Sequence, residues 1–318
     1  MSEFILKLGT KTSFRTAYAI NMKRIFHQVL LVMFLAIMIA SVGCKSYPTS
    51  PQIPQTENGS WTIYTPYNWP HDGRPYSSTY CIVYSDEASY EMKQQMGQLA
   101  DEKFSRILQL FNFNNLSDFR YPPGYSKIEI YINRNHPENI AWAYWGGFII
   151  TIRSSDLIGH WYTYAVYTAT HELTHIFEFL IEGREMLGTY VWFKEGIAVY
   201  TGCLEYPGWQ TIENLNELES WISENQNVTG QGNPIKIHQN EDFPPGADWH
   251  RYYQFFELAM RYLLDRRGLG KSYRDVLDLF YDMRNGISFP VSFQNHFGIS
   301  LDDFEIEFYD RMRAYLSQ

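Results

Sequence analysis

The residues best suited to chemistry in this chain are two histidines that lie one helical turn apart. The segment His171-Glu172-Leu173-Thr174-His175 places two imidazoles four residues apart, with a carboxylate directly after the first. On a helix, residues i and i+4 share one face about 5–6 Å apart, so both rings can reach a single metal ion. Glu172 then lies beside the ion, where a general base can take a proton from a metal-bound water. The segment therefore predicts a zinc-binding helix that carries its own base.

A third ligand is needed, because catalytic zinc combines three protein ligands with one open position for water. Glu195 is the candidate, since it is a carboxylate within the apolar segment 191–200 and is costly to bury there unless a positive charge pairs with it. We therefore expect His171, His175 and Glu195 to hold one Zn²⁺ ion. Two alternatives remain: the histidines are ordinary helix residues, and Glu195 pairs with Lys194 or faces water at a helix start.

These residues resemble the gluzincin metallopeptidases, and most of all their peptidase MA-like branch. The resemblance rests on the segment 171–175, nineteen intervening residues before Glu195, and the sequence Trp192-Phe193-Lys194-Glu195-Gly196-Ile197-Ala198. It extends over most of the chain after residue 60. The resemblance implies that His171, His175 and Glu195 bind one zinc ion and that Glu172 is the base. It also implies an enzyme, a zinc-dependent endopeptidase that hydrolyses bonds in a peptide or protein substrate.

Two departures from the family limit what it implies here. Thermolysin-type enzymes place an acidic residue four positions after the glutamate ligand to orient a histidine, but that position is Val199. Another residue or a backbone carbonyl must therefore orient His171 and His175. Aminopeptidase N-like enzymes carry a Gly-x-Met-Glu-Asn segment that captures the substrate amine, and this sequence has none. An aminopeptidase is accordingly disfavoured.

A hydrogen-bond donor must stabilise the oxyanion that forms when an amide is attacked. The family often takes a tyrosine or histidine from its helical half for this purpose. Matching the predicted helix 252–267 to that half makes Tyr253 the counterpart, with Tyr252 one residue out of register and His250 as the other candidate. The alternative is that Tyr253 is an ordinary core or surface tyrosine.

The N-terminal region 1–44 is interpreted as a signal region. Met22 precedes a basic pair and is the expected true start, and an apolar run of fourteen residues, 29–42, ends at Gly43-Cys44. This run is shorter than the roughly 20 residues that a membrane-spanning helix needs. Cys44 resembles the lipidated cysteine of bacterial lipoproteins, although Ser41 stands where leucine is usual. We therefore expect a lipid anchor in the membrane of the bacterial cell envelope; an ordinary signal peptide or an uncleaved anchor is the alternative.

Charge and composition narrow the choice of partner. The first 44 residues carry five basic groups and one acidic group, so the rest carries 21 basic and 34 acidic groups, a net charge of −13. We therefore expect no nucleic-acid partner, because the negative charge of the chain would repel the phosphate backbone. The proline-containing segment 45–60 is predicted to be a flexible linker, and 61–318 a single metallopeptidase-like domain. Within it, Cys81 and Cys203 form either a disulfide or two buried thiols.

The predicted elements place the motif helix between a small sheet and a mostly helical half. Strands are expected at 80–84, 127–132 and 146–152, and helices at 88–111, 161–180, 212–223, 252–267, 273–281 and 301–315, with a polar loop at 224–234. This is an α+β, zincin-like arrangement with a small mixed sheet. By the resemblance, strand 148–152 would be the edge strand that pairs with substrate; the alternative is an ordinary core strand.

A second class of function fits part of the sequence. Aromatic residues make up 17% of the chain, which is compatible with a non-catalytic envelope lipoprotein that binds a polypeptide or a glycan. The enzyme is favoured, because a binding protein needs neither a base between two ligands nor an open zinc position.

Overall fold

The computed structural model describes residues 73–85, 88–133, 141–151, 162–184, 191–206, 211–229 and 249–318. The predicted signal region 1–44 with Met22 and Cys44, the linker 45–60 and the first residues of the predicted domain lie outside the described residues. Among the described helices, none is long and apolar enough to cross a membrane.

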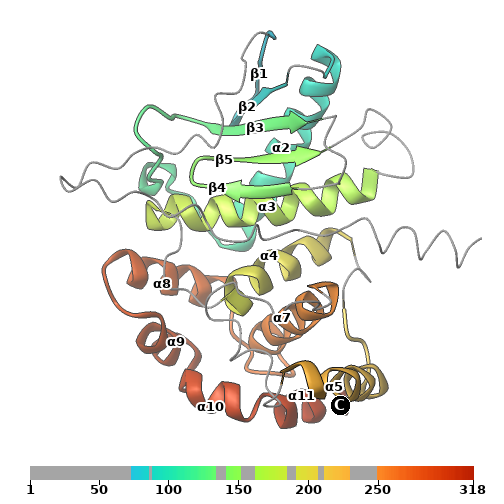
Figure 1. Ribbon diagram of the computed structural model, residues 1–318. Coiled ribbons are helices and arrows are strands. Elements are labelled where there is room, and N and C mark those ends of the chain that lie inside the picture. The colour runs from blue at the N-terminus through green and yellow to red at the C-terminus, as the bar shows by residue number, and fades with distance from the viewer. Residues whose placement is uncertain are drawn as a thin grey trace, which may run out of the picture. The chain divides into compact units, whose positions relative to one another are not determined.

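A five-stranded mixed sheet forms the N-terminal part of the described fold (Figure 1). Its order is β1-β2-β3-β5-β4. The strands are β1 (Tyr76–Ser77), β2 (Cys81–Tyr84), β3 (Ile128–Asn133), β4 (Ala141–Tyr144) and β5 (Gly147–Thr151). The three central strands β2, β3 and β5 run parallel, and β1 and β4 pair antiparallel at the two edges. The sheet is therefore small and mixed, as predicted.

The expected edge strand is not at the edge. The predicted strand 148–152 corresponds to β5, which pairs with β3 on one side and β4 on the other; Ile152 lies outside the described residues. Its residues Phe148, Ile149 and Ile150 are all fully buried, which is the pattern of a central strand covered on both faces. On this side of the sheet the edge strand is β4, which was not predicted from the sequence.

Helices make up most of the remaining described structure. They are α2 (Tyr90–Leu110), α3 (Tyr162–Glu182), α4 (Val191–Glu205), α5 (Leu215–Thr229), α7 (Trp249–Leu264), α8 (Tyr273–Arg284), α9 (Phe289–Phe297), α10 (Leu301–Ile306) and α11 (Phe308–Leu316), with a 3₁₀ turn η1 at Leu116–Asp118. Their ends follow local rules: Ser89 caps α2, Ser272 and Asp275 form a capping box on α8, and left-handed Gly298 ends α9.

Helix α3 connects the sheet to the helical half (Figure 1). It packs against α2, β4 and β5 on one side and against α4 and α8 on the other, and α4 in turn packs against α7. A small mixed sheet joined to a mostly helical remainder is compatible with the predicted α+β class.

The interior is rich in aromatic rings. The largest fully buried side chains are all aromatic: Trp192, Tyr252, Tyr315, Phe104, Phe111, Phe148, Phe177, Phe193, Phe255, Phe256, Phe280 and Phe293. Among the large exposed apolar side chains of the described ranges, only Tyr90 is aromatic. Core packing therefore accounts for much of the aromatic content. Cys81 and Cys203 are both buried free thiols, so the predicted alternative of a disulfide between them is wrong.

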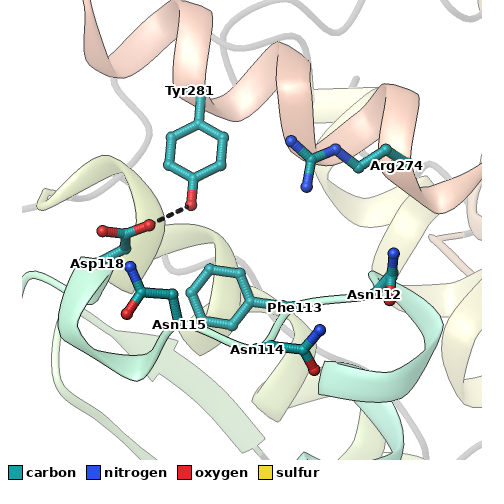
Figure 2. Close-up of a pocket in the computed structure, with 7 residues that line it drawn as sticks. All are labelled: Asn112, Phe113, Asn114, Asn115, Asp118, Arg274 and Tyr281. Carbon is teal, nitrogen blue, oxygen red and sulfur yellow. Dashed lines mark hydrogen bonds between the residues drawn. The ribbon is translucent and has the colours of Figure 1, made fainter.

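A surface hollow lies between the loop after α2 and helix α8 (Figure 2). Its volume is about 470 Å³, and most of its lining residues are polar: Asn112, Phe113, Asn114, Asn115, Asp118, Arg274 and Tyr281. The Tyr281 hydroxyl donates to Asp118 Oδ2 at 3.0 Å and so ties α8 to η1. This hollow contains none of the residues that the sequence analysis selected for chemistry.

Candidate metal centre

Helix α3 presents two histidine rings on one face, as the i and i+4 spacing requires. Every residue from 165 to 182 is buried, so the helix passes through the core, which fits its largely apolar sequence. The buried hydroxyls of Thr170 and Thr174 donate to carbonyls four residues earlier, at 2.7 and 2.8 Å, so they remain satisfied there. His171 and His175 are 3% and 4% exposed, and their Nε2 atoms lie 3.2 Å apart.

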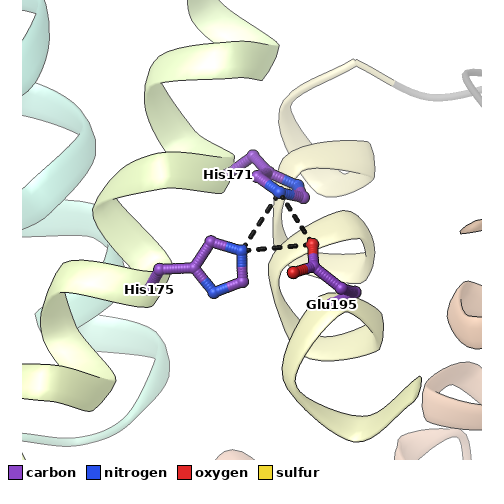
Figure 3. A group of neighbouring side chains, drawn as sticks. All are labelled: His171, His175 and Glu195. Atoms are coloured by element: carbon purple, nitrogen blue, oxygen red, sulfur yellow. Dashed lines mark hydrogen bonds and ion pairs between the residues drawn. The ribbon is translucent and has the colours of Figure 1, made fainter. Parts of the chain in front are cut away.

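Glu195 joins the two histidines from the first turns of α4. Its Oε2 lies 3.4 Å from Nε2 of His171 and 3.3 Å from Nε2 of His175. Figure 3 shows both rings of α3 pointing toward this carboxylate on the neighbouring helix. Within the described part of the chain, these three residues form the group of side chains whose donor atoms lie close enough together to hold one metal ion. The structure thus brings together all three ligands that the sequence predicts.

The spacing of the donor atoms fits a tetrahedral metal. Bonds of about 2.0–2.1 Å at tetrahedral angles hold neighbouring donor atoms about 3.3–3.4 Å apart. The three observed separations are 3.2, 3.3 and 3.4 Å. Two imidazoles and one carboxylate are also a ligand set of known catalytic zinc sites. The residues present therefore fit a single zinc ion, although the same set also suits other divalent metals.

Charges within this buried group are mutually dependent. Burial opposes a charge on His175, but the carboxylates of Glu195 and Glu178 outweigh it and raise the pKa of His175 to about 10. Burial also opposes the charge on Glu195, yet the two histidines and Lys194 hold its pKa well below the usual value. For His171, burial prevails and lowers the pKa, despite its contact with Glu195. The carboxylates thus favour the charged form of His175, and the histidines favour the ionised form of Glu195.

Glu178 is a buried neighbour of this group that the sequence analysis missed. It is 0% exposed, and its Oε2 lies 3.5 Å from Nδ1 of His175. The sequence could have indicated this contact, because Glu178 lies three residues after His175 and therefore on the same face of the helix. For His171, the buried Nδ1 has no hydrogen-bond partner among the described residues. Val199, four residues after Glu195, is fully buried.

The predicted base lies next to the ligands without belonging to their group. Glu172 follows His171 in α3 and is 2% exposed. The converging donor atoms come from His171, His175 and Glu195 and do not include its carboxylate. This placement is compatible with a base that acts beside a metal.

The three candidates for the oxyanion donor occupy different surroundings. Tyr253 is 6% exposed, and its ring meets the ring of His171 edge-on with centroids 6.2 Å apart. Tyr252 is 1% exposed and packs against Trp221 at 5.7 Å, within the core. His250 lies in the first turn of α7, but its side chain is outside the described structure. Of the two tyrosines, Tyr253 is thus the one beside a predicted ligand.

Comparison with known proteins gives no further guidance. The sequence matches no protein-family model, and no curated protein matches it.

Proposed function

We propose that this chain is a zinc-dependent hydrolase of peptide bonds, and specifically an endopeptidase of the gluzincin type. The observation that carries the proposal is the buried triangle of donor atoms from His171, His175 and Glu195, with sides of 3.2–3.4 Å. Such a triangle leaves room in the ligand set for a fourth, exchangeable position, which distinguishes catalytic from structural zinc sites.

Each residue of the site has a role in this proposal. His171, His175 and Glu195 would hold the metal, which lowers the pKa of a water molecule toward 7 and polarises a carbonyl oxygen. Glu172, buried beside His171, takes the proton from the attacking water and later gives it to the leaving amine. Tyr253, edge-on to His171, donates a hydrogen bond where the negative charge of the oxyanion develops.

The proposed setting follows from the N-terminal region. A lipid on Cys44 would anchor the chain in the membrane of the bacterial cell envelope, and the linker 45–60 would hold the domain away from it. The substrate is then a peptide or protein outside the cytoplasm. Labelling with a lipid precursor tests this setting, because Cys44→Ala should abolish incorporation.

The hydrolase is tested by separating metal binding from turnover. The purified protein should contain one zinc per chain, and His175→Ala should lose it. Glu172→Gln should retain zinc but lose at least about 10²-fold in the rate of peptide hydrolysis, because the base is gone. Glu182→Gln is the matched control, since it changes a buried glutamate of the same helix whose oxygens are hydrogen-bonded to no described residue and do not belong to the converging group.

The assay uses an unbiased peptide library with and without chelator. Hydrolysis at the wild-type rate by Glu172→Gln would show that Glu172 is not the base. A folded protein that binds no metal would instead favour the alternative, a non-catalytic envelope lipoprotein that binds a polypeptide or a glycan.

A further inference from the structure

Helix α3 carries a buried carboxylate whose position calls for a partner. Glu178 is 0% exposed and lies near the C-terminal end of a helix that is buried along residues 165–182. An ionised carboxylate is costly to bury unless a charge or hydrogen bonds compensate it. Its Oε1 has no hydrogen-bond partner among the described residues, so in this part of the chain Glu178 is hydrogen-bonded through Oε2, and the charges of His175 and Lys194 also favour its ionised form.

Oε2 of Glu178 contacts Nδ1 of His175, the ring nitrogen that does not contact Glu195. Glu178 Oε2 lies 3.5 Å from Nδ1 of His175, at the outer limit for a hydrogen bond. The other nitrogen of that ring, Nε2, lies 3.3 Å from Glu195 and 3.2 Å from His171. One imidazole thus contacts a carboxylate on one side and the ligand group on the other.

The contact has a consequence for the tautomer of His175. When Nδ1 donates its proton to a carboxylate, Nε2 keeps a free lone pair that can bind a metal. The ring of Phe179 stacks on His175 with centroids 6.3 Å apart and an interplanar angle of 17°, which restricts rotation of the imidazole. Glu178 and Phe179 together therefore favour one ring orientation, with Nε2 toward Glu195.

No comparable carboxylate comes from α4. The position one turn after Glu195 is Val199, which is fully buried and apolar. In the described part of the chain, Nδ1 of His171 also has no hydrogen-bond partner. The two histidines thus differ at Nδ1: that of His175 contacts a carboxylate of its own helix, and that of His171 contacts none among the described residues.

We propose that Glu178 is a positioning residue that fixes His175 in the tautomer that presents Nε2 to the metal. The inference rests on the metal centre of the proposed function, but not on the reaction that the centre performs. Glu178 does not touch substrate or metal; it acts through His175.

The test compares zinc affinity in the full chain purified in detergent. Zinc is titrated against a chromophoric chelator with wild type, Glu178→Ala, Glu178→Gln and Glu182→Ala. We expect Glu178→Ala to bind zinc about 10–100-fold more weakly, as is usual when the partner of a ligating histidine is removed. Glu178→Gln should lose less, because its amide oxygen can still accept from Nδ1. Glu182→Ala is the matched control, a buried carboxylate one turn further along α3, and should remain within about twofold of wild type.

A second measurement does not depend on any variant. In zinc-loaded wild type, nitrogen-detected NMR of the histidine rings should show the proton of His175 on Nδ1 and the metal on Nε2. The reverse assignment, or equal zinc affinity of wild type and folded Glu178→Ala, would overturn the proposal. If wild type binds zinc but hydrolyses no peptide, only the proposed function fails. If wild type binds no zinc, both fail.

Discussion

At the scale of single residues, the site depends on compensation between buried charges. His175 and Glu195 lie 3.3 Å apart, and each stabilises the charged form of the other. Removing one member of such a pair leaves the other as an uncompensated buried charge, which is strongly destabilising. Variants of the ligands therefore change stability as well as metal binding, and folding must be measured alongside both.

The two adjacent tyrosines of α7 allow a matched test of oxyanion stabilisation. Tyr253→Phe keeps the ring beside His171 but removes the hydroxyl, so we expect kcat to fall by about 10²–10³-fold with zinc affinity unchanged. Tyr252→Phe alters a ring that packs on Trp221 in the core, and should leave kcat within about twofold. Steady-state kinetics on one peptide substrate distinguishes them. A wild-type kcat in Tyr253→Phe would assign the role to another group.

Glu182 provides a prediction about pH. Burial, and then the charge of Glu178, raise the pKa of Glu182 to about 8, against the opposing effect of Arg184. An unfolded chain releases this proton near pH 4.5, so the wild type loses stability as the pH rises from about 5 to 8. Glu182→Gln removes this loss. The melting temperature of the variant minus that of wild type should therefore increase over this range, by about 2–4 °C per kcal/mol recovered. If the difference in melting temperature does not change with pH, Glu182 does not have a raised pKa in the folded protein.

At the scale of elements, the position of Glu195 depends on close packing between α4 and α7. A Cβ atom at Gly196 would lie 2.7 Å from the carbonyl oxygen of Phe256 and 2.8 Å from Cγ of Met260. The helices can approach this closely because residue 196 has no side chain. The glycine that follows Glu195 is thus explained by packing against α7.

Gly196→Ala should therefore weaken both the fold and the metal site. Overpacking costs about 1–3 kcal/mol, of which the better helix propensity of alanine returns about 0.5–1 kcal/mol. We expect a lower melting temperature and weaker zinc binding, because Glu195 moves with α4. Leu204→Ala, on the same helix but 43% exposed, is the control and should change neither by much. A variant that melts at or above the wild-type temperature would show that α4 and α7 separate at little cost.

Elements with clear periodicity were predictable from the sequence. The helix predicted at 161–180 is α3 (Tyr162–Glu182), and the helix predicted at 252–267 is α7 (Trp249–Leu264). Helix α7 has apolar residues at spacings of three and four, whereas α3, which is buried along residues 165–182, was predicted from its histidine spacing and from flanks without Pro or Gly. The convergence of His171, His175 and Glu195 was also predictable, since it combines a fixed spacing on one helix with one carboxylate in an apolar segment.

Other elements were missed or misplaced where local pattern does not determine structure. Helix α4 is buried on nearly every side, so its sequence has no polar face to mark the period. The helix predicted at 301–315 is divided at Glu307 into α10 and α11, and the helix predicted at 212–223 is α5, which continues to Thr229 through part of the predicted polar loop. No helix was predicted between residues 281 and 301, where α9 forms. Helix ends of this kind are set by capping and tertiary contacts.

The order of the strands and the contact of Glu178 with His175 could not be predicted from the sequence. Strand β4 has four residues, too few for a periodic signal, and only its pairing with β5 shows which strand is at the edge. From the sequence alone, Glu178 resembles any polar residue on a helix surface, because the sequence does not show that α3 is buried. In both cases the missing information is which elements pack together.

At the scale of the whole described fold, the candidate metal centre lies where the helices meet. His171 and His175 come from α3, which packs on the sheet, while Glu195 comes from α4, which packs on α7 in the helical half (Figure 1). An ion bound by all three would join these two parts. A ligand that binds only the folded state stabilises it by an amount that grows with ligand concentration.

Metal removal should therefore lower the stability of the entire fold. At a free zinc concentration about 1,000 times the dissociation constant, the ion contributes about 4.1 kcal/mol, which corresponds to roughly 8 °C or more in melting temperature. We expect the melting temperature in chelator to be lower by about this amount and to return to its original value when zinc is restored. His175→Ala should melt at the same temperature in chelator and in zinc, because it lacks the ligand that links α3 to Glu195. Identical wild-type melting curves under both conditions would mean that His171, His175 and Glu195 do not hold zinc in solution.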